Sequence, residues 1–309
     1  MQVSRRKFLM NGSLSVAGTM LLPKSFFAMN SIFPASDDHI IGIQLYTVRD
    51  DMKKDPLGTL KQLAAMGYKN VEHAGYHDRK FYGYSIADFK NILNDNGLKM
   101  ASGHNPLTSK QWDKSKNDFT DEWKYTIEDA ADAGITYMIS PGVDESLCKT
   151  MDDFKFYMDM HNKTGELCKK AGIHFAFHNE SYEFNHSLGN TVLYELLLQL
   201  TDKSLVAQQM DIGNMYEPGG RPLNYLKKYP GRFLLMHVKD EVKRVTPEAD
   251  GRIYENTLLG KGVIDVKDVV DFARKSGTKY FIIEQEEYQG KTPLDCAEED
   301  LRVLQNWGY

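Results

Sequence analysis

Short apolar runs alternate with amphipathic segments along the chain from about residue 39 onward. Runs such as 40–45, 233–238 and 280–283 are rich in Ile, Leu, Phe and Val, as is typical of buried strands in a parallel sheet. The segments between such runs repeat apolar residues every three or four positions and often end at glycine, for example at Gly67 after 56–66. This pattern predicts strands and helices that follow one another in turn.

Eight such strand-then-helix units occur in roughly 270 residues, which is the usual length of one (β/α)8 barrel. Strands that alternate with helices, without hairpin signals between them, form a parallel sheet. A doubly wound open sheet is the alternative, but it usually has fewer strands, and no G-x-G-x-x-G motif follows the first run. We therefore expect a single-domain α/β fold, a (β/α)8 TIM barrel, over 37–309. The predicted strands are 40–45, 70–73, 98–102, 135–139, 173–177, 205–210, 233–238 and 280–283, and the predicted helices are 56–66, 85–96, 119–133, 151–170, 191–200, 223–229, 266–275 and 294–307.

Residues 1–36 have the pattern of an export signal and linker. Ser4-Arg5-Arg6-Lys7-Phe8-Leu9 is a twin-arginine motif, and the weakly apolar stretch 13–22 that follows is too short to span a bilayer. A basic disordered tail is the alternative interpretation. A twin-arginine signal predicts a periplasmic protein that has no membrane span once the signal is removed.

Composition and charge weigh against nucleic acid as a partner. The formal net charge is −5, whereas a surface that binds nucleic acid is expected to be basic. The three cysteines, Cys148, Cys168 and Cys296, are scattered, and their odd number excludes a fully paired set of disulfides. We therefore expect buried free thiols in a globular domain.

Four potential metal ligands stand at the ends of the last four predicted strands. They are His178, Asp211, His237 and Glu284. A lone His on an apolar strand is more often a core residue, but the carboxyl ends of barrel strands meet at one mouth, where these side chains would lie together. A mixed set of imidazole and carboxylate ligands suits Mn, Co, Fe, Ni or Zn better than Ca. The pattern therefore predicts a site for a divalent metal ion.

The chain resembles the xylose-isomerase-like family of sugar phosphate isomerases and epimerases over most of 39–309. The resemblance rests on five phrases in order, namely GIQLYT at 42–47, HNESYEF at 178–184, DIGN at 211–214, HVKD at 237–240 and EQE at 284–286. It implies a divalent metal held by an acid, an Asp, a His and a Glu from strands five to eight, and Asp211, His237 and Glu284 match the last three. At strand five, many relatives have Glu where this chain has His178. The exported branch of the family, whose phrase is H-N-H-x-x-E-F, also has His there. Glu180 takes the place of the second His in that phrase.

A metal site of this kind supports the removal of a proton next to a carbonyl group. A metal bound to a carbonyl and an adjacent hydroxyl stabilises an enediolate, and Glu284 or Glu180 is a suitable base. His178 could remain a ligand, with Glu180 as a further carboxylate, and Lys239 could neutralise an oxyanion. In the epimerases that the chain resembles, two Glu ligands form the acid/base pair, and His178 replaces one of them here.

Three functions are compatible with this sequence. The first is a divalent-metal-dependent isomerase or epimerase of an unphosphorylated sugar or keto-sugar, since no glycine-rich phosphate loop accompanies Arg221 or Arg252. The second is a lyase or hydratase of 3-keto-glycosides or of their elimination products, because His178 interrupts the pair of glutamates. The third is a non-catalytic periplasmic carbohydrate-binding protein. Relatives often dimerise, so a homodimer is an open alternative.

Four further residues are candidates for contacts with a carbohydrate substrate. His104 ends predicted strand three, Glu72 and His73 end strand two, and Trp112 lies in the loop after strand three, where its ring could stack on a sugar. Each could instead be a structural hydrogen-bonding or packing residue. Because these residues lie at or after strand ends, we expect them at the mouth of the barrel.

Overall fold

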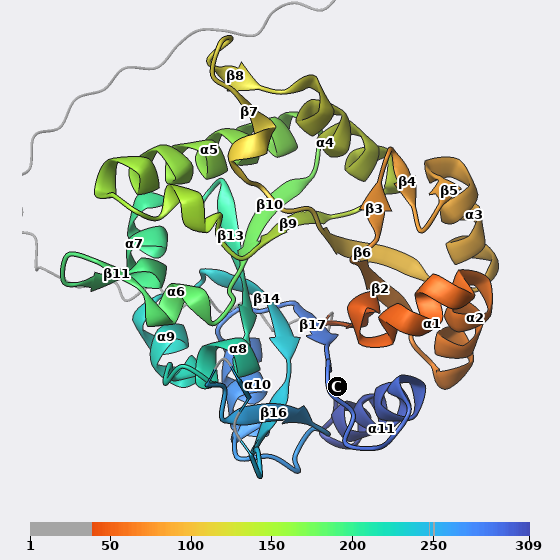
Figure 1. The fold of residues 1–309 in the computed structure, drawn as a ribbon. Helices are drawn as coiled ribbons and strands as arrows, with labels where there is room; N and C mark the ends of the chain where they lie inside the picture. The colour runs from red at the N-terminus through yellow and green to blue at the C-terminus, as the bar shows by residue number, and fades with distance from the viewer. Residues whose placement is uncertain (1–38, 247, 250) are drawn as a thin grey trace, which may run out of the picture. The chain divides into compact units, whose positions relative to one another are not determined.

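Eight parallel strands form a closed barrel at the centre of the molecule, surrounded by helices (Figure 1). The computed structural model describes residues 39–309 apart from 247 and 250, so the predicted export signal lies outside the described residues. Each strand pairs with the next barrel strand along the chain, and the last pairs with the first, which confirms the predicted (β/α)8 barrel. In order, the barrel strands are β1 (Ile40–Gln44), β2 (Asn70–His73), β6 (Lys99–His104), β9 (Tyr137–Pro141), β10 (His174–His178), β13 (Val206–Asp211), β14 (Phe233–Val238) and β17 (Tyr280–Ile283).

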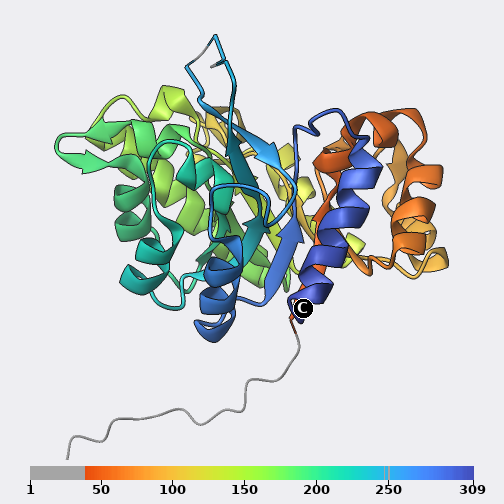
Figure 2. The ribbon, with the colours of Figure 1, turned by 90° about the horizontal axis from the view of Figure 1, so that it is seen from below.

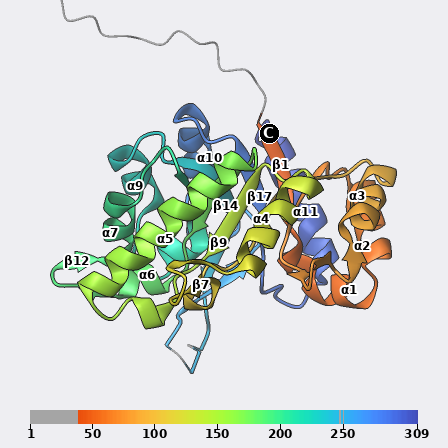
Figure 3. The same ribbon diagram turned by 90° about the horizontal axis from the view of Figure 1, so that it is seen from above.

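Helices connect the barrel strands and cover the outside of the barrel. Several begin at a hydroxyl side chain that accepts the backbone N–H three residues further on, as at Ser85, Thr120, Thr150 and Thr292. Figures 1 and 3 show α4 and α5 side by side, with α5 against β10. The helices are α1 (Arg49–Lys54), α2 (Pro56–Met66), α3 (Ile86–Asp95), α4 (Asp121–Ala133), α5 (Met151–Lys170), α6 (Tyr182–Asn185), α7 (Leu193–Leu200), α8 (Ile212–Tyr216), α9 (Pro222–Lys228), α10 (Val266–Lys275) and α11 (Pro293–Asn306).

The loops after four of the barrel strands contain short antiparallel strands that the sequence did not predict. Most of these strands are two residues long, too short for an alternation of apolar and polar positions to be visible. They lie on the mouth side of the barrel, and the hairpin of β15 and β16 projects from the end opposite the C-terminus (Figure 2). Their bounds are β3 (Tyr76–His77), β4 (Lys80–Phe81), β5 (Tyr84–Ser85), β7 (Trp112–Asp113), β8 (Asp118–Phe119), β11 (Ser187–Leu188), β12 (Thr191–Val192), β15 (Asp240–Lys243) and β16 (Tyr254–Thr257).

Side chains that point into the barrel form an apolar layer and, nearer the mouth, a polar layer. Alternate residues of each strand point inward, and one buried cluster contains the inward residues Ala176, Leu235 and Ile282. Two residues further along β10 and β14, His178 and His237 lie on the same face, near the carboxyl ends of the strands. The polar layer therefore lies at the mouth.

Two shifts of strand pairing decide which residues share the polar layer. Leu234 of β14 has no partner in β13, so the pairing shifts by one residue and Asp211 lies opposite His237. Ala101 of β6 likewise has no partner in β2, so that Glu72 lies opposite Ser102. Each extra residue exchanges the inward and outward side chains beyond it, since successive side chains of a strand point to opposite faces.

The three cysteines are buried and free, which confirms the prediction of free thiols. Burial raises the pKa of the Cys148 thiol to about 12, so this group is protonated at neutral pH and is a weak nucleophile. Across the part of the chain that the structure describes, no helix combines the length and apolar character needed to cross a membrane.

Gly165 provides a test of the packing of α5. A Cβ at this buried position would overlap the carbonyl oxygen of Leu205, just before β13. Alanine is the better helix former by about 1 kcal/mol, yet we expect Gly165→Ala to destabilise the fold by roughly 1–3 kcal/mol in urea unfolding, because of this overlap. Glu166→Ala, at the exposed neighbouring position, should leave stability unchanged or slightly higher. Equal stability of Gly165→Ala and the unaltered protein would contradict the close packing.

Candidate metal centre and active site

The four predicted metal ligands come together in the polar layer. One ligand atom from each of His178, Asp211, His237 and Glu284 lies within 4.8 Å of those of the others, and all four side chains are buried. His237 Nδ1 is 2.9 Å from Glu284 Oε2 and 3.6 Å from Asp211 Oδ2. His178 Nε2 is 3.9 Å from the same Asp211 oxygen. We call these residues the four-residue group.

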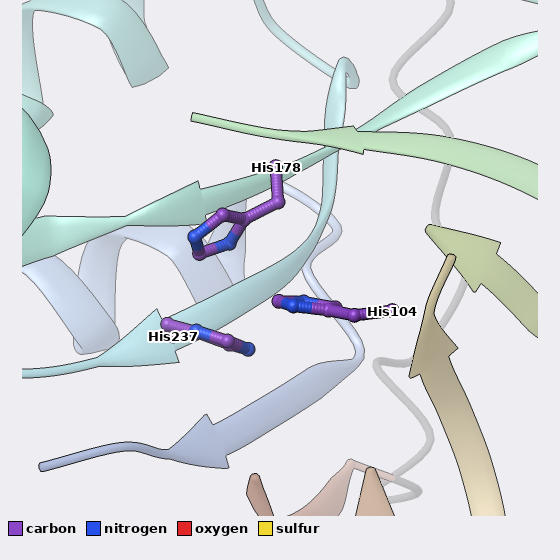
Figure 4. A group of neighbouring side chains, drawn as sticks. All are labelled: His104, His178 and His237. Carbon is purple, nitrogen blue, oxygen red and sulfur yellow. The ribbon is translucent and has the colours of Figure 1, made fainter. Parts of the chain in front are cut away.

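A second group of potential ligands overlaps the first. It consists of His104, His178 and His237, which come from β6, β10 and β14 (Figure 4). The ring of His104 stacks on that of His237, with centroids 5.3 Å apart and an interplanar angle of 14°, and its centroid is 4.9 Å from that of His178. Since the two groups share two histidines, the hydrogen bonds of each ring decide which nitrogen atoms could bind a metal.

Glu72, at the end of β2, is the acceptor around which these rings are arranged. It is fully buried. The side chains that point at its two oxygens, at 2.5–3.1 Å, are those of Gln44, Ser102, His104, Gln209 and His237. Burial raises the pKa of Glu72, but His237 and His104 lower it, and the result is a pKa well below the usual value. The carboxylate is therefore charged, and each atom that faces it must supply a hydrogen.

The hydrogen bonds that lead outward from Glu72 set the proton positions on two histidines. The amide nitrogen of Gln209 donates to Glu72 over 2.7 Å, so the amide oxygen is the atom 3.1 Å from His178 Nδ1. This oxygen can only accept, so His178 bears a proton on Nδ1, and its Nε2, which faces Asp211, is the nitrogen left for a ligand. His237 donates from Nε2 to Glu72 over 2.6 Å, which leaves its Nδ1 as the nitrogen for a ligand.

The Nε2 atom of His104 is unavailable to a metal for the same reason. His104 Nε2 lies 3.0 Å from the amide oxygen of Gln209 and 3.1 Å from Glu72 Oε1, both of which are acceptors. Its Nε2 must therefore carry a proton. His104 and His237 thus point N–H bonds at Glu72, whereas His178 Nε2 and His237 Nδ1 face the carboxylates of the four-residue group, which makes that group the candidate metal centre.

Asp211 gives an independent test of this assignment. Its Oδ1 accepts the backbone N–H of Asn214 over 2.8 Å, and Asn179 holds its backbone N–H and C=O groups. Its Oδ2 is buried and accepts no hydrogen bond from the described residues, although the ammonium nitrogen of Lys239 forms an ion pair with it at 3.0 Å without the geometry of a hydrogen bond. A divalent cation would satisfy this oxygen, and the mixed nitrogen and oxygen donors suit Mn, Co, Fe, Ni or Zn.

Lys239 is a buried cation beside the same carboxylates. Its ammonium nitrogen lies 2.8 Å from Glu284 Oε2 and 2.6 Å from Glu286 Oε1, besides its contact with Asp211. Burial lowers the pKa of Lys239, but the three carboxylates raise it well above its usual value. Lys239 therefore stays charged and offsets part of the negative charge of the centre.

Bound protons compete with a metal at this centre. Burial lowers the pKa of His237, but Glu284 and Glu72 raise it well above its usual value. Burial raises the pKa of Glu284, but Lys239 and His237 lower it well below. His237 thus carries two protons while Glu284 is ionised, and metal binding would displace the proton on Nδ1.

A cavity of about 300 Å³ opens beside the four-residue group. Its walls include Tyr46, Ala74, His104, His178, Glu180, Glu284 and Glu286. The side chain of Glu180 is 47% exposed, and its Oε1 is 3.5 Å from His178 Nε2. Asn214 Nδ2 donates to Glu180 Oε2 over 2.7 Å and so fixes its orientation. Glu180 is therefore a solvent-facing carboxylate next to the candidate metal centre.

A second carboxyl group positions Glu180. Glu183 is fully buried on α6, three residues further along the chain, and its Oε2 accepts the backbone N–H of Glu180 over 2.8 Å. Burial, together with the nearby Glu180, raises the pKa of Glu183 to about 8. Glu183 is therefore mostly protonated at neutral pH, and its second oxygen, Oε1, has no hydrogen-bond partner among the described residues.

The residues predicted to contact a substrate lie in different places. His104 lines the cavity, whereas Glu72 lies beneath the histidines and bonds to His237. His73 is buried with its ring 4.8 Å from that of Phe81, and it does not line the cavity. Trp112 likewise packs away from the cavity, in an aromatic cluster with Phe119 and Phe156. Direct contact of these four residues with a substrate stays a prediction.

Sequence reasoning missed several residues that the site depends on. Gln209 precedes Asp211 by two positions on β13, and Ser102 precedes His104 by two on β6, so each pair shares one face of its strand. That spacing could have identified both. Gln44 has no predicted site residue two positions away, and its signal in the sequence is that it is a polar residue near the end of the first apolar run.

Removing the amide of Gln209 tests the proton positions derived above. We expect Gln209→Leu to weaken metal binding by about 10–100-fold, because His178 loses the acceptor that keeps its proton on Nδ1. Titration of Zn²⁺ or Mn²⁺ into chelator-stripped protein measures this. Gln208→Leu is the matched control, since Gln208 is also buried on β13 but points to the opposite face. Unchanged metal affinity in Gln209→Leu, or an equal loss of affinity in both variants, would show that this hydrogen-bond network does not determine which nitrogen of His178 is available to a metal.

The raised pKa of Glu183 predicts how the free energy of unfolding depends on pH. Its pKa of about 8 lies above the ordinary value of about 4.3. The folded state therefore favours the protonated form of Glu183. The stability that this provides is fully present below the pKa of Glu183 in the unfolded chain and is lost as pH rises through 8. We expect unfolding free energy to fall by roughly 2–4 kcal/mol from about pH 5 to pH 9 through this group, and Glu183→Gln to remove that part. Parallel stability profiles for the variant and the unaltered protein would contradict this assignment.

Comparison with curated proteins finds inosose dehydratases. The protein of that name from Clostridium beijerinckii is 22% identical over 270 residues, which cover 81% of this chain and 84% of that protein. Inosose dehydratase 2 of Bacillus cereus is 28% identical over 148 residues, or 45% of this chain and 49% of that protein. The match thus spans about half of the length of the Bacillus relative.

Solved structures and a family model agree on the fold. A sugar phosphate isomerase/epimerase from Parabacteroides distasonis is 27% identical, with a TM-score of 0.71 over 86% of this chain and 98% of that one. The family model described as xylose isomerase-like TIM barrel matches residues 60–307, which include seven of the eight barrel strands. The chain therefore belongs to the xylose isomerase-like TIM barrel family.

Proposed function

We propose that the protein is a metal-dependent enzyme that removes a proton next to the carbonyl group of an unphosphorylated keto-sugar and then eliminates a leaving group. The observation that supports this most is the four-residue group beside a cavity that Glu180 enters. A divalent ion held by this group would polarise the carbonyl and stabilise negative charge on its oxygen. The protein's own groups then have to supply a base and hold the sugar.

Glu180 is the proposed base. Its carboxylate faces the cavity, and Asn214 and the backbone contact with Glu183 hold it in place. Glu284 also lines the cavity, but its Oε2 is engaged by Lys239 at 2.8 Å and by His237 at 2.9 Å. A carboxylate between two cationic groups binds a proton weakly, so Glu180 is the better acceptor.

The presence of one such base favours elimination over epimerisation. Elimination requires one group to take the proton while the substituent on the next carbon departs, and hydration is the reverse reaction. Epimerisation by two bases requires a proton donor on the opposite face, and His178 stands at one of the two positions. The similarity to inosose dehydratases supports the same choice.

Isomerisation or epimerisation, which the sequence placed first, is the second candidate. Glu284 lines the same cavity as Glu180, so a second carboxyl group is present in the site. The similar structure from Parabacteroides distasonis is called a sugar phosphate isomerase/epimerase. The two candidates share the first proton transfer and differ in the fate of the resulting enediolate.

The charges of the cavity support an unphosphorylated substrate. Glu180, Glu284 and Glu286 line it, and none of the described lining residues is Lys or Arg. A phosphate group would therefore meet carboxylates there and no Lys or Arg in the wall to pair with. A periplasmic location, which rests on the twin-arginine motif outside the described residues, is a further part of this proposal.

Metal content and turnover test the proposal together. We expect about one Mn, Co, Fe, Ni or Zn ion per chain in protein purified without chelator, and none in Asp211→Ala, by elemental analysis. Glu180→Gln should keep its metal and lose turnover of 3-keto-glucosides by at least about 100-fold. Glu145→Gln, an exposed change outside the cavity, should match the unaltered protein.

The products in deuterated water separate the candidates. Elimination releases the leaving group and gives an unsaturated ketone with strong ultraviolet absorption, whereas epimerisation gives the intact keto-sugar with deuterium next to the carbonyl. Absence of metal in the protein even after metal is added back, with binding of sugar but no deuterium exchange, would refute the catalytic proposal in favour of a carbohydrate-binding protein.

A further inference from the structure

A second cavity adjoins the first at the barrel mouth. We call it the outer cleft; its volume is about 420 Å³, and its walls include Leu45, Tyr46, Met52, Pro56, Ala74 and Tyr82. Tyr46 and Ala74 also line the cavity of about 300 Å³ beside the four-residue group, which we call the inner cavity. The two spaces therefore meet at these two residues.

The outer cleft and the inner cavity differ in chemical character. Three carboxylates line the inner cavity. The charged groups of the outer cleft are instead the cations Arg49 and Lys53, and none of its described lining residues is acidic. Aliphatic and aromatic side chains make up the rest of its wall. A ligand that fills both spaces would have a polar end that binds near the metal centre and an apolar end that tolerates negative charge.

Tyr46 is held rigidly between the two spaces. The guanidinium of Arg49 lies over its ring, 4.6 Å from the centroid, and donates to the Tyr46 carbonyl and to the Tyr288 hydroxyl. Gln44, which bonds to Glu72, also accepts the backbone N–H of Tyr46. With 42% of its surface exposed, Tyr46 offers a fixed aromatic surface to a ligand.

Tyr82 provides a second fixed ring at the junction. Its φ of 50° is in the left-handed region, which is unfavourable for a bulky residue. Its ring lies so close to Gly75 that a Cβ there would overlap it, and its hydroxyl accepts the backbone N–H of Ala74 over 3.0 Å. Backbone strain that the surroundings maintain is concentrated at functional sites. Two tyrosines thus flank the passage at Ala74.

We propose that the outer cleft binds an aromatic leaving group of a glycoside while the keto-sugar ring occupies the inner cavity. This inference rests on the proposed function and names its substrate class. In the reaction, the C–H bond next to the carbonyl breaks and its proton goes to Glu180, a C=C bond forms, and the bond from the neighbouring carbon to the glycosidic oxygen breaks. Glu180 then releases its proton to water and the departing phenolate takes one up, so the products are an unsaturated keto-sugar and a phenol. Cations in the cleft match the negative charge of that leaving group.

Binding of unoxidised glycosides tests the cleft without requiring turnover. By calorimetry on the full-length protein, we expect phenyl β-glucoside to bind about tenfold more tightly than methyl β-glucoside, since its ring is buried between tyrosines. Tyr46→Ala should bring the two affinities close together. Tyr125→Ala is the matched control, because Tyr125 is 45% exposed but lies on α4 outside both cavities, and the tenfold preference should remain.

A blocking variant keeps the test valid if Tyr46→Ala proves unstable. Ala74 is exposed, so Ala74→Trp should fold, fill the passage between the two spaces and abolish the preference for the phenyl glycoside. Equal affinity of the two glycosides for the unaltered protein, or a preference that survives both variants, would overturn the inference. Tighter binding of cellobiose than of phenyl β-glucoside would also overturn it, since the cleft would then be a sugar subsite.

The outcomes separate this inference from the proposed function. Asp211→Ala and Glu180→Gln are expected to lose metal and turnover respectively and to keep the ratio of phenyl to methyl affinity, because neither residue lines the outer cleft. A preserved ratio without any turnover in the unaltered protein would refute only the proposed reaction. Turnover with no preference for the aromatic group would refute only the assignment of the cleft.

Discussion

The buried carboxylate of Glu72 is the constraint on which the polar layer depends. A charge with no access to water is strongly unfavourable unless hydrogen-bond donors surround it. Here the donors come from four other barrel strands, β1, β6, β13 and β14, so the charge fixes side chains that are far apart in the sequence. Since a carboxylate can only accept, it also dictates which atom of each neighbour points inward. The geometry of the candidate metal centre follows from the fact that Glu72 accepts hydrogen bonds from its neighbours and donates none.

The hydrogen bonds around Glu72 also connect the rigid and the variable parts of the site. The four-residue group stands on or next to barrel strands, whose pairing leaves little freedom of position. The proposed base and the walls of the outer cleft lie outside the barrel strands, in the segments that follow β10, β1 and β2, where a family can alter its substrate without altering the centre. Gln44 joins the two parts, because its amide bonds to Glu72 on one side and to the backbone of Tyr46 on the other.

The fold was predictable because each strand and helix has its own local signal. The long helix 151–170 and the strands 233–238 and 280–283 have the predicted bounds. The approach of the four ligands also followed from their positions at strand ends. Their protonation did not, because it depends on contacts between residues as distant as Glu72 and His237. The short hairpins escaped prediction since two-residue strands show no periodicity, and His73 shows that a strand-end position alone does not place a side chain in the cavity.

The shifted registers at Ala101 and Leu234 have a consequence for protein design. In a barrel of perfectly regular pairing, Leu234 would lie opposite Gln209, and Met236, rather than His237, would lie opposite Asp211. Transferring the site's side chains to an idealised barrel would therefore scatter them between its two faces. The irregular backbone is as much a part of the centre as the residues that it presents, and a scaffold intended to host this chemistry has to reproduce both.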